Sequence, residues 1–112
     1  MMDWTMKRGD IFWVNLDTTL GSEINKKRPC VLIGATPINK IRRTVVVIPL
    51  SSSPQARPPL SVPVTCLGKQ AVAVCDQIRA VDKARILGPA GQLSTTELKT
   101  LESALKQVLV LL

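Results

Sequence analysis

The sequence contains no histidine, and this absence excludes several classes of enzyme. A Ser-His-Asp triad and any acid–base pair built on imidazole are both ruled out. The cysteines Cys30, Cys66 and Cys75 are odd in number, lie among apolar neighbours and form no C-x-x-C pair. Without histidine or paired thiols we expect no metal site and no cofactor, and we interpret the cysteines as reduced, packed thiols.

Aromatic residues are also scarce, at 3% of the chain. Trp4, Phe12 and Trp13 are the only ones, so the core must be built from Val, Ile and Leu. The same scarcity argues against a typical single-strand binding protein that stacks bases on several aromatic rings.

Long apolar runs are missing as well. The first ten residues carry Asp3, Lys7, Arg8 and Asp10, which is unlike a secretory signal, and the terminal VLVLL is too short to span a bilayer. We therefore expect a cytoplasmic protein. A length of 112 residues with 46% hydrophobic residues predicts a single domain over residues 1–112.

Charge of one sign is abundant. The 15 Lys and Arg residues outnumber the 8 Asp and Glu residues, which gives a formal net charge of +7. This excess favours a polyanionic partner such as nucleic acid, an acidic protein or an anionic membrane, although basic proteins without such partners are common.

Several runs of β-branched and apolar residues predict strands. They cover residues 9–16, 28–35, 44–50, 60–66 and 70–75. The run at 28–35 is nearly all apolar, so it is expected to be buried on both faces. Pro49 cannot donate a ladder hydrogen bond, which predicts a strand edge or a bulge there. Ile86 and Leu87 are predicted to pair only briefly.

The remaining segments between the strands read as connections. Residues 17–27 and 51–59 have loop character, and residues 36–43 form a polar, basic connection. Residues 76–82 mix charged residues with apolar anchors, and no element is assigned to them.

The end of the chain predicts a helix. Ser94 and Glu97 have capping-box spacing, and an apolar stripe of helical period follows: Leu98, Leu101, Leu105, Val108 and Leu112. The expected fold class is α+β, mainly β, a small and partly closed barrel of about five to seven short strands with a C-terminal helix.

Three cations in a row precede the second predicted strand. Lys26 and Lys27 are most simply a solvated loop, with phosphate binding as the alternative. Arg28 precedes Pro29, which pushes its backbone into extended geometry at the mouth of a buried strand. A sheltered guanidinium needs a partner, either a carboxylate of the protein or a phosphate of a ligand. The candidate carboxylates are Asp17, Glu23 and Asp76.

Two further polar groups lie on connections beside strands. One comprises Lys40, Arg42 and Arg43, and the other comprises Ser51, Ser52, Ser53 and Arg57. If connections at one end of a barrel converge, these groups form a basic, hydroxyl-rich groove. The alternative is that they decorate different sides of the molecule.

Five short motifs in register resemble the MazF/PemK family of toxin endoribonucleases. They are KRGDIFWVNLD at 7–17, LGSE at 20–23, RPCVLI at 28–33, VIPLS at 47–51 and DQIRAVDK at 76–83. The resemblance implies an SH3-like β-barrel with a C-terminal helix, usually a homodimer. It also implies metal-independent cleavage of single-stranded RNA at short motifs, leaving 2′,3′-cyclic phosphate and 5′-hydroxyl ends. The implied partner is an antitoxin with an acidic C-terminal segment.

The same resemblance implies roles for individual residues. Arg28 begins the R-P-x-V strand and is the expected catalytic arginine, and Ser51 is the expected catalytic hydroxyl, where many relatives have Thr. Because Ser52 and Ser53 adjoin it, the identity of the hydroxyl stays open. The predicted RNA-binding residues are Glu23, Lys26, Lys27, Lys40, Arg42, Arg43, Ser52, Ser53, Arg57 and Gln77. Arg79 is interpreted as structural, paired with Asp76 or Asp82.

Two other readings share the predicted fold. A CcdB-like gyrase inhibitor acts through a Trp-Gly-Ile tail, whereas this chain ends in Val110, Leu111 and Leu112. A catalytically silent SH3-like binding module is the third reading, and the presence of both Arg28 and Ser51 argues against it. Covalent scission of RNA separates the first hypothesis from the other two.

Overall fold

Strands dominate the computed structural model, which describes residues 4–16, 27–52 and 55–111. The strands are β1 (Asp10–Asn15), β2 (Lys27–Leu32), β3 (Thr44–Ser51), β4 (Ser61–Cys66), β5 (Lys69–Val74), β6 (Arg79–Asp82) and β7 (Ile86–Gln92). The helices are α1 (Thr36–Ile41) and α2 (Thr95–Leu109), and two 3-10 turns are η1 (Cys75–Gln77) and η2 (Lys83–Arg85).

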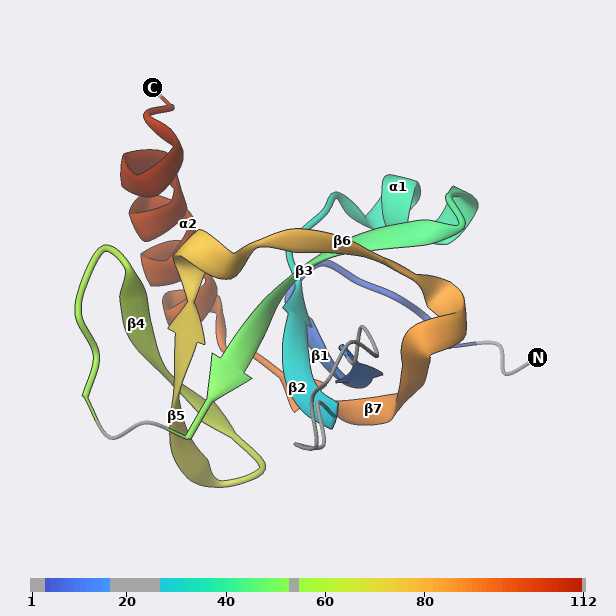
Figure 1. Ribbon diagram of the computed structural model, residues 1–112, viewed down its shortest axis with the longest axis horizontal. Helices are drawn as coiled ribbons and strands as arrows, with labels where there is room; N and C mark the ends of the chain where they lie inside the picture. Colours follow the sequence, from blue (N-terminus) through green and yellow to red (C-terminus); the bar gives the residue numbers. More distant parts are fainter. Residues whose placement is uncertain (1–3, 17–26, 53–54, 112) are drawn as a thin grey trace, which may run out of the picture.

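The strands form one curled sheet in the order β4-β5-β3-β2-β1-β7, with β6 alongside β3. Each of these pairings is antiparallel. In Figure 1, β1, β2, β3, β6 and β7 surround a central space, while β4 and β5 extend to the side that carries α2. The predicted class, a mainly β barrel-like fold with a C-terminal helix, is therefore confirmed as a curled half-barrel.

β3 changes its partner partway along one edge. Residues Thr44 to Val47 pair with β6, whereas Leu50 and Ser51 pair with β5. Between these two pairings, residues 74–78 turn away from β3, so Ile48 and Pro49 have no strand partner on this edge. Since proline has no N–H to donate, this interruption costs no hydrogen bond at Pro49. The strand edge predicted at Pro49 takes the form of this unpaired stretch on one side of β3, while on the other side Pro49 pairs with Cys30.

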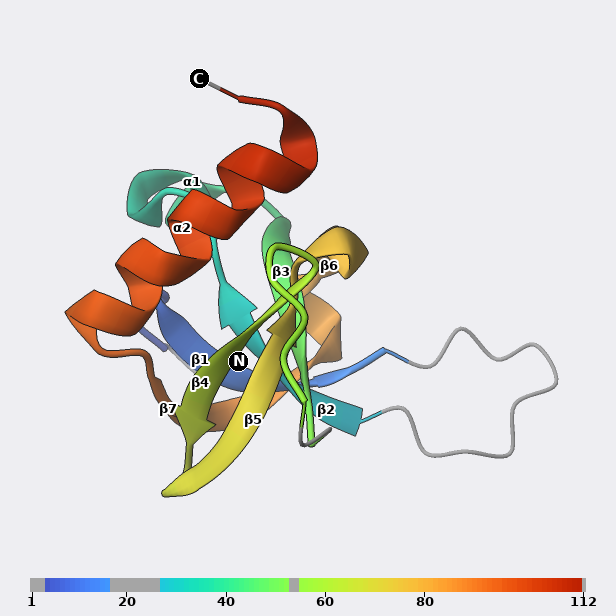
Figure 2. The same ribbon diagram turned by 90° about the vertical axis from the view of Figure 1, so that its left-hand side faces the viewer.

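Alternating side chains of the sheet feed two separate cores. Ile11, Val31 and Ile48 belong to a core closed by α2, whereas their chain neighbours Phe12 and Cys30 belong to the other core. Figure 2 shows α2 lying across one face of the sheet. Because both faces are covered, the apolar run in β2 is buried on both sides, as its sequence predicts.

The capping box at the start of α2 is present as predicted. The Ser94 hydroxyl accepts a hydrogen bond from the Glu97 N–H at 3.1 Å, and the Glu97 carboxylate accepts one from the Ser94 N–H at 3.0 Å. The same carboxylate accepts the N–H of Thr65 at 2.7 Å, which joins α2 to β4. Leu101 and Leu105 are buried on the inner face of this helix, as its apolar period predicts. Leu112 lies outside the described residues.

Two connections are more ordered than the sequence predicts. The segment 36–43, expected as a polar connection, contains the short helix α1, which begins with Pro37 in its first turn. Ile86 and Leu87 open a strand of seven residues rather than pairing briefly. β7 is irregular because its pairing with β1 shifts register twice, and such breaks hide a strand from a period-two pattern.

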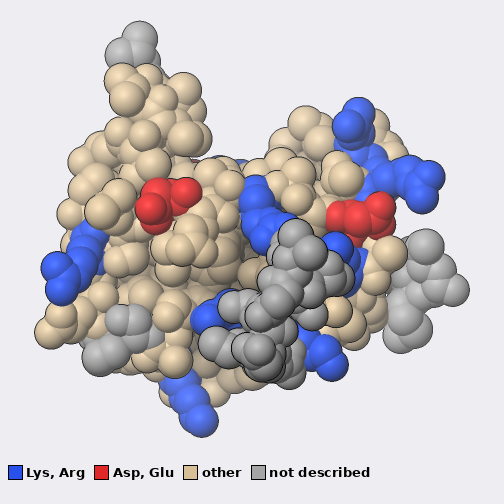
Figure 3. Space-filling model, viewed as in Figure 1, with Lys and Arg blue, Asp and Glu red and all other residues tan. Residues whose placement is uncertain are grey.

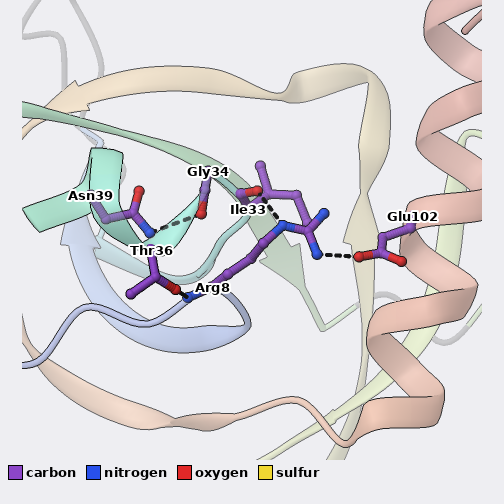
Figure 4. A network of polar contacts seen from close by, with 6 residues as sticks. All are labelled: Arg8, Ile33, Gly34, Thr36, Asn39 and Glu102. Carbon is purple, nitrogen blue, oxygen red and sulfur yellow. Dashed lines mark hydrogen bonds and ion pairs between the residues drawn. The ribbon is translucent and has the colours of Figure 1, made fainter.

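Arg8 joins the N-terminal segment to three other parts of the fold (Figure 4). Its Nε donates to the carbonyl of Ile33 at 2.9 Å, and its backbone N–H donates to the Thr36 hydroxyl at 2.9 Å. Its guanidinium also forms an ion pair with Glu102 on α2. Beside this network, buried Asn39 donates through Nδ2 to the Gly34 carbonyl at 2.9 Å. The barrel, α1 and α2 are thus tied together on the side away from the candidate site.

Candidate functional site

Arg28 lies at the start of β2, at the open end of the core inside the barrel. It pairs with Val14 of β1, and it faces the same side as Cys30 because side chains alternate along a strand. Cys30 belongs to the barrel core, so this face turns inward. Arg28 is half-buried, which agrees with the partly sheltered position expected from the sequence.

Ser51 reaches the same place from the neighbouring strand. Cys30 pairs with Pro49, and continuing this antiparallel register by two residues sets Arg28 opposite Ser51. Residues opposite each other in an antiparallel pair point to the same face. The register of β2 and β3 therefore brings the two predicted catalytic side chains together.

Two adjoining cavities share Arg28, Leu50 and Ser51 as lining residues. The larger has a volume of about 620 Å³ and the smaller about 370 Å³. Polar or aromatic residues found only in the larger cavity are Trp13, Lys27, Ser52, Lys69 and Gln70. Those found only in the smaller cavity are Gln77 and Arg79. Arg28 and Ser51 thus stand at the junction of a continuous hollow.

The hollow is positively charged. None of the described residues that line either cavity is acidic, whereas Lys27, Arg28, Lys69 and Arg79 all contribute to the walls. On the face seen in Figure 3, basic side chains occur over the middle and the lower edge, while acidic ones form two separate patches. A cavity of this charge selects an anion.

Cys30 lies beneath the cationic groups but is not a nucleophile. Burial raises the pKa of its thiol to about 12, against the opposing influence of the Arg79 and Arg28 charges. A thiol with that pKa stays protonated at neutral pH. Cys30, Cys66 and Cys75 are all buried and free, so each fills space in a core.

The predicted RNA-binding residues fall into four groups. Lys27 and Ser52 line the larger cavity and Gln77 lines the smaller one, so all three accompany Arg28 and Ser51. Arg57 is exposed on the segment before β4 and lines neither cavity. Glu23, Lys26 and Ser53 lie outside the described residues.

The last group, Lys40, Arg42 and Arg43, lies away from the two cavities. Lys40 is on α1, and Arg42 and Arg43 follow it directly, so all three are near the first residue of β3, whereas Ser51 is the last. The carbonyls of Lys40 and Arg43 accept hydrogen bonds from Lys83, which fixes this corner to η2. The structure does not bring these three cations to the cavity that holds Arg28.

Sequence reasoning missed several lining residues. Trp13, in β1, pairs with Pro29 of β2 and is 37% exposed. Its ring therefore faces the larger cavity rather than a core. The signal was available, because Phe12 and Val14 are both buried and the residue between them must face the other side of the sheet. Lys69 and Gln70 line the larger cavity from the β4–β5 hairpin. No local sequence pattern predicts that this hairpin lies near the start of β2.

Within the described ranges, no helix is long and apolar enough to cross a membrane.

Comparison with known proteins places this architecture in one family. Residues 7–109 match the PemK-like, MazF-like toxins of type II toxin–antitoxin systems. The endoribonuclease MazF9 of Mycobacterium tuberculosis is 36% identical over 110 residues, covering 90% of this chain and 93% of that protein. The resemblance proposed from the five sequence motifs is confirmed.

Solved structures agree at the level of the fold. A MazE–MazF crystal structure from Deinococcus radiodurans superposes with a TM-score of 0.83 at 20% identity, covering 98% of this chain and 100% of that one. MazF from the same organism gives a TM-score of 0.81 at 21% identity, covering 96% of this chain and 99% of that one. With a matching family and a relative named as an endoribonuclease, this chain belongs to the PemK-like, MazF-like toxins of type II toxin–antitoxin systems.

Proposed function

We propose that this protein is a sequence-specific endoribonuclease that cuts single-stranded mRNA without a metal ion and so stops translation and growth. The observation that carries the proposal is the junction of the two cavities, where Arg28 and Ser51 meet in a basic hollow. The relative with 36% identity, named as an endoribonuclease, supports the reaction class.

The proposed reaction is an internal transesterification. The ribose 2′-oxygen attacks its own 3′-phosphate, so a 2′-O–P bond forms while the bond from phosphorus to the 5′-oxygen of the next nucleotide breaks. The 2′-hydroxyl loses a proton and the departing 5′-oxygen gains one. The products are a 2′,3′-cyclic phosphate end and a 5′-hydroxyl end.

Arg28 and Ser51 stabilise the charge that builds up on phosphorus. The planar guanidinium of Arg28 can donate two parallel N–H bonds to non-bridging phosphate oxygens. The Ser51 hydroxyl can donate one more. The guanidinium of arginine is effectively always charged in proteins, which suits it to stabilise negative charge rather than to carry the proton.

The walls of the larger cavity suit the nucleotides around the cut. Lys27, with Lys26 before it in the chain, would hold flanking phosphates. Ser52 would contact the RNA in the larger cavity and Gln77 would contact it in the smaller one. The exposed ring of Trp13 offers a surface on which a base can stack. Glu23, Ser53 and Arg57 stay predicted RNA contacts, and Lys40, Arg42 and Arg43 would meet only a longer strand.

The proposed partners are an antitoxin and a second copy of the chain. A cationic cavity is best blocked by an acidic segment, which is the expected form of the antitoxin. Self-association is supported by an apolar groove where α2 ends beside β3. Val46, Leu109 and Leu111 line it and are 37%, 44% and 58% exposed. Exposed apolar surface of this kind can serve as a protein–protein interface. A toxin that cuts mRNA acts in the cytoplasm.

Cleavage mapping tests the proposal. Purified protein and its Arg28→Ala variant are incubated with a long single-stranded RNA in excess EDTA, and the new ends are identified. Discrete cuts with cyclic-phosphate ends, absent in the variant, are expected. The variant should keep its circular dichroism spectrum, because Arg28 is only half-buried. Intact RNA across several long substrates would contradict the proposal, and gyrase inhibition would then be measured.

A further inference from the structure

Arg79 begins the strand that flanks β3 on the edge opposite to β2. The register sets Arg79 opposite Val47, level with Leu32, whereas Arg28 is aligned with Ser51. β2 and β6 are both antiparallel to β3 and flank it, so they run in the same direction. Arg79 is the first residue of β6, and Arg28 is the second residue of β2. The two arginines therefore stand at the same end of two parallel strands.

Both arginines also face the same side of the sheet. Val47 pairs with Leu32 on one edge of β3 and with Arg79 on the other. Leu32 and Val47 belong to the barrel core, as does Cys30, which shares its face with Arg28. Since directly opposed residues share a face, Arg79 faces the interior of the barrel, as Arg28 does.

The smaller cavity brings the two arginines together. Arg28 and Arg79 both line it, together with Ser51 and Gln77. Their common influence on the pKa of the Cys30 thiol indicates that both charges lie close to that sulfur.

No carboxylate neutralises this pair of charges in the described part of the chain. The ion pair between Arg8 and Glu102 lines a different cavity. Asp82, one of the partners considered for Arg79, accepts the backbone N–H of Ala84 at 2.8 Å and caps η2. Neither Asp82 nor Asp76 pairs with Arg79, so the structural role expected from the sequence is not what the geometry shows. Two like charges that share a half-buried cavity repel each other until an anion binds between them.

We propose that Arg79 is a second catalytic guanidinium, which binds the scissile phosphodiester together with Arg28. This assignment rests on the proposed ribonuclease function. The phosphorane that forms during the reaction carries more negative charge than the starting phosphodiester. A second cation at the same phosphate therefore stabilises the transition state more than the bound substrate, and its loss lowers kcat.

The test compares three variants. Arg79→Gln removes the cation, Arg79→Lys keeps the charge but loses the fork, and Lys99→Gln on exposed α2 is the control for a lost unit of charge. Cleavage of single-stranded RNA is measured as kcat and KM in EDTA. Binding of a mixed-sequence single-stranded deoxyoligonucleotide, which has no 2′-hydroxyl and is not cut, is measured against salt concentration. Circular dichroism checks that each variant is folded.

We expect Arg79→Gln to lower kcat about 100-fold, with Arg79→Lys between it and the wild type and Lys99→Gln within about twofold of the wild type. The log–log salt slope of binding should fall by about 0.7 in Arg79→Gln. Equal behaviour of Arg79→Gln and Lys99→Gln would overturn the proposal, as would lost cleavage with an unchanged slope. If the wild type cuts no RNA but the slope still falls with Arg79→Gln, the phosphate site stands and the ribonuclease proposal fails.

Discussion

Arg8 and Glu102, ninety-four residues apart in the chain, form an ion pair that joins the N-terminal segment to α2. Both side chains are about one-third exposed, so the pair itself is worth at most about 1 kcal/mol. Arg8 also holds the Ile33 carbonyl through Nε. The contact therefore belongs to a network rather than to an isolated surface pair.

Substitutions in this network should have unequal effects on stability. Glu102→Gln should lower the free energy of unfolding by about 0.5 to 1 kcal/mol, and Arg8→Ala by about 1 to 2 kcal/mol, because the second variant also frees the Ile33 carbonyl. Urea denaturation of both variants measures the difference. Equal losses would mean that the bond to Ile33 contributes nothing.

Gly34 should not tolerate a methyl group. A Cβ there would lie 2.8 Å from Oδ1 of Asn39, which is buried and held through its Nδ2. Gly34→Ala should therefore lower the free energy of unfolding by about 1 to 3 kcal/mol. Gly88→Ala is the matched control, since an added Cβ meets nothing within 4 Å. A neutral Gly34→Ala variant in thermal denaturation would show that Asn39 can move aside.

Glu97 should make stability depend on pH in the acid range. Partial burial acts to raise the pKa of its carboxyl, but hydrogen bonds from Ser94 and Thr65 outweigh burial and lower it. A lowered pKa in the folded state means that the carboxylate stabilises the fold above about pH 4.5. This contribution is lost as the pH falls through the folded-state pKa. The stability advantage of the wild type over Glu97→Gln should thus shrink on acidification from pH 6 to pH 3, measured by urea denaturation at each pH. A constant difference would contradict this role.

Ser51 and Ser52 should differ in their effect on cleavage. Ser51 lines both cavities beside Arg28, whereas Ser52 lines only the larger one. Ser51→Ala should lower kcat by about 100- to 1,000-fold, and Ser51→Thr should retain most activity because the hydroxyl is kept. Ser52→Ala should cost about tenfold or less. The reverse order in single-turnover kinetics would assign the catalytic hydroxyl to Ser52.

Trp13 should affect binding more than chemistry. Its exposed ring lies in the larger cavity, so Trp13→Ala should weaken binding of an uncleavable oligonucleotide by about 1 to 3 kcal/mol, with a smaller change in kcat. Trp4→Ala, which alters a ring packed against Phe12, is the control for general loss of aromatic packing. Quenching of Trp13 fluorescence on binding would support stacking, and unchanged affinity would contradict it.

Local sequence patterns predicted much of this fold because they reflect interactions between residues that are close in the chain. The capping box at Ser94 and the β-branched run in β3 were read correctly, since each depends only on near neighbours in the chain. α1 was missed because its six residues bury one side chain, Asn39, which is not apolar. Its position depends on contacts with Met6 and Gly34, which no periodicity reveals.

The candidate site, like the fold, was predicted where short motifs sufficed and missed where contacts between distant residues decide. Arg28 and Ser51 were identified from short motifs, but their meeting depends on the register of β2 against β3. Arg79 was assigned a structural role because Asp76 and Asp82 are near in sequence. In the fold, Asp76 lies within the turn η1 that precedes β6, and the Asp82 carboxylate accepts the N–H of Ala84. Nearness along the chain was a poor guide here.

The gap in pairing along one edge of β3, at Ile48 and Pro49, makes the shape and the charge of the smaller cavity depend on different parts of the chain. The smaller cavity opens where residues 74–78 leave the sheet edge, so its existence depends on the path of the backbone. Its charge depends on a few side chains at strand ends. Substitutions at these strand ends can therefore change the charge of the cavity while the barrel that carries them stays the same.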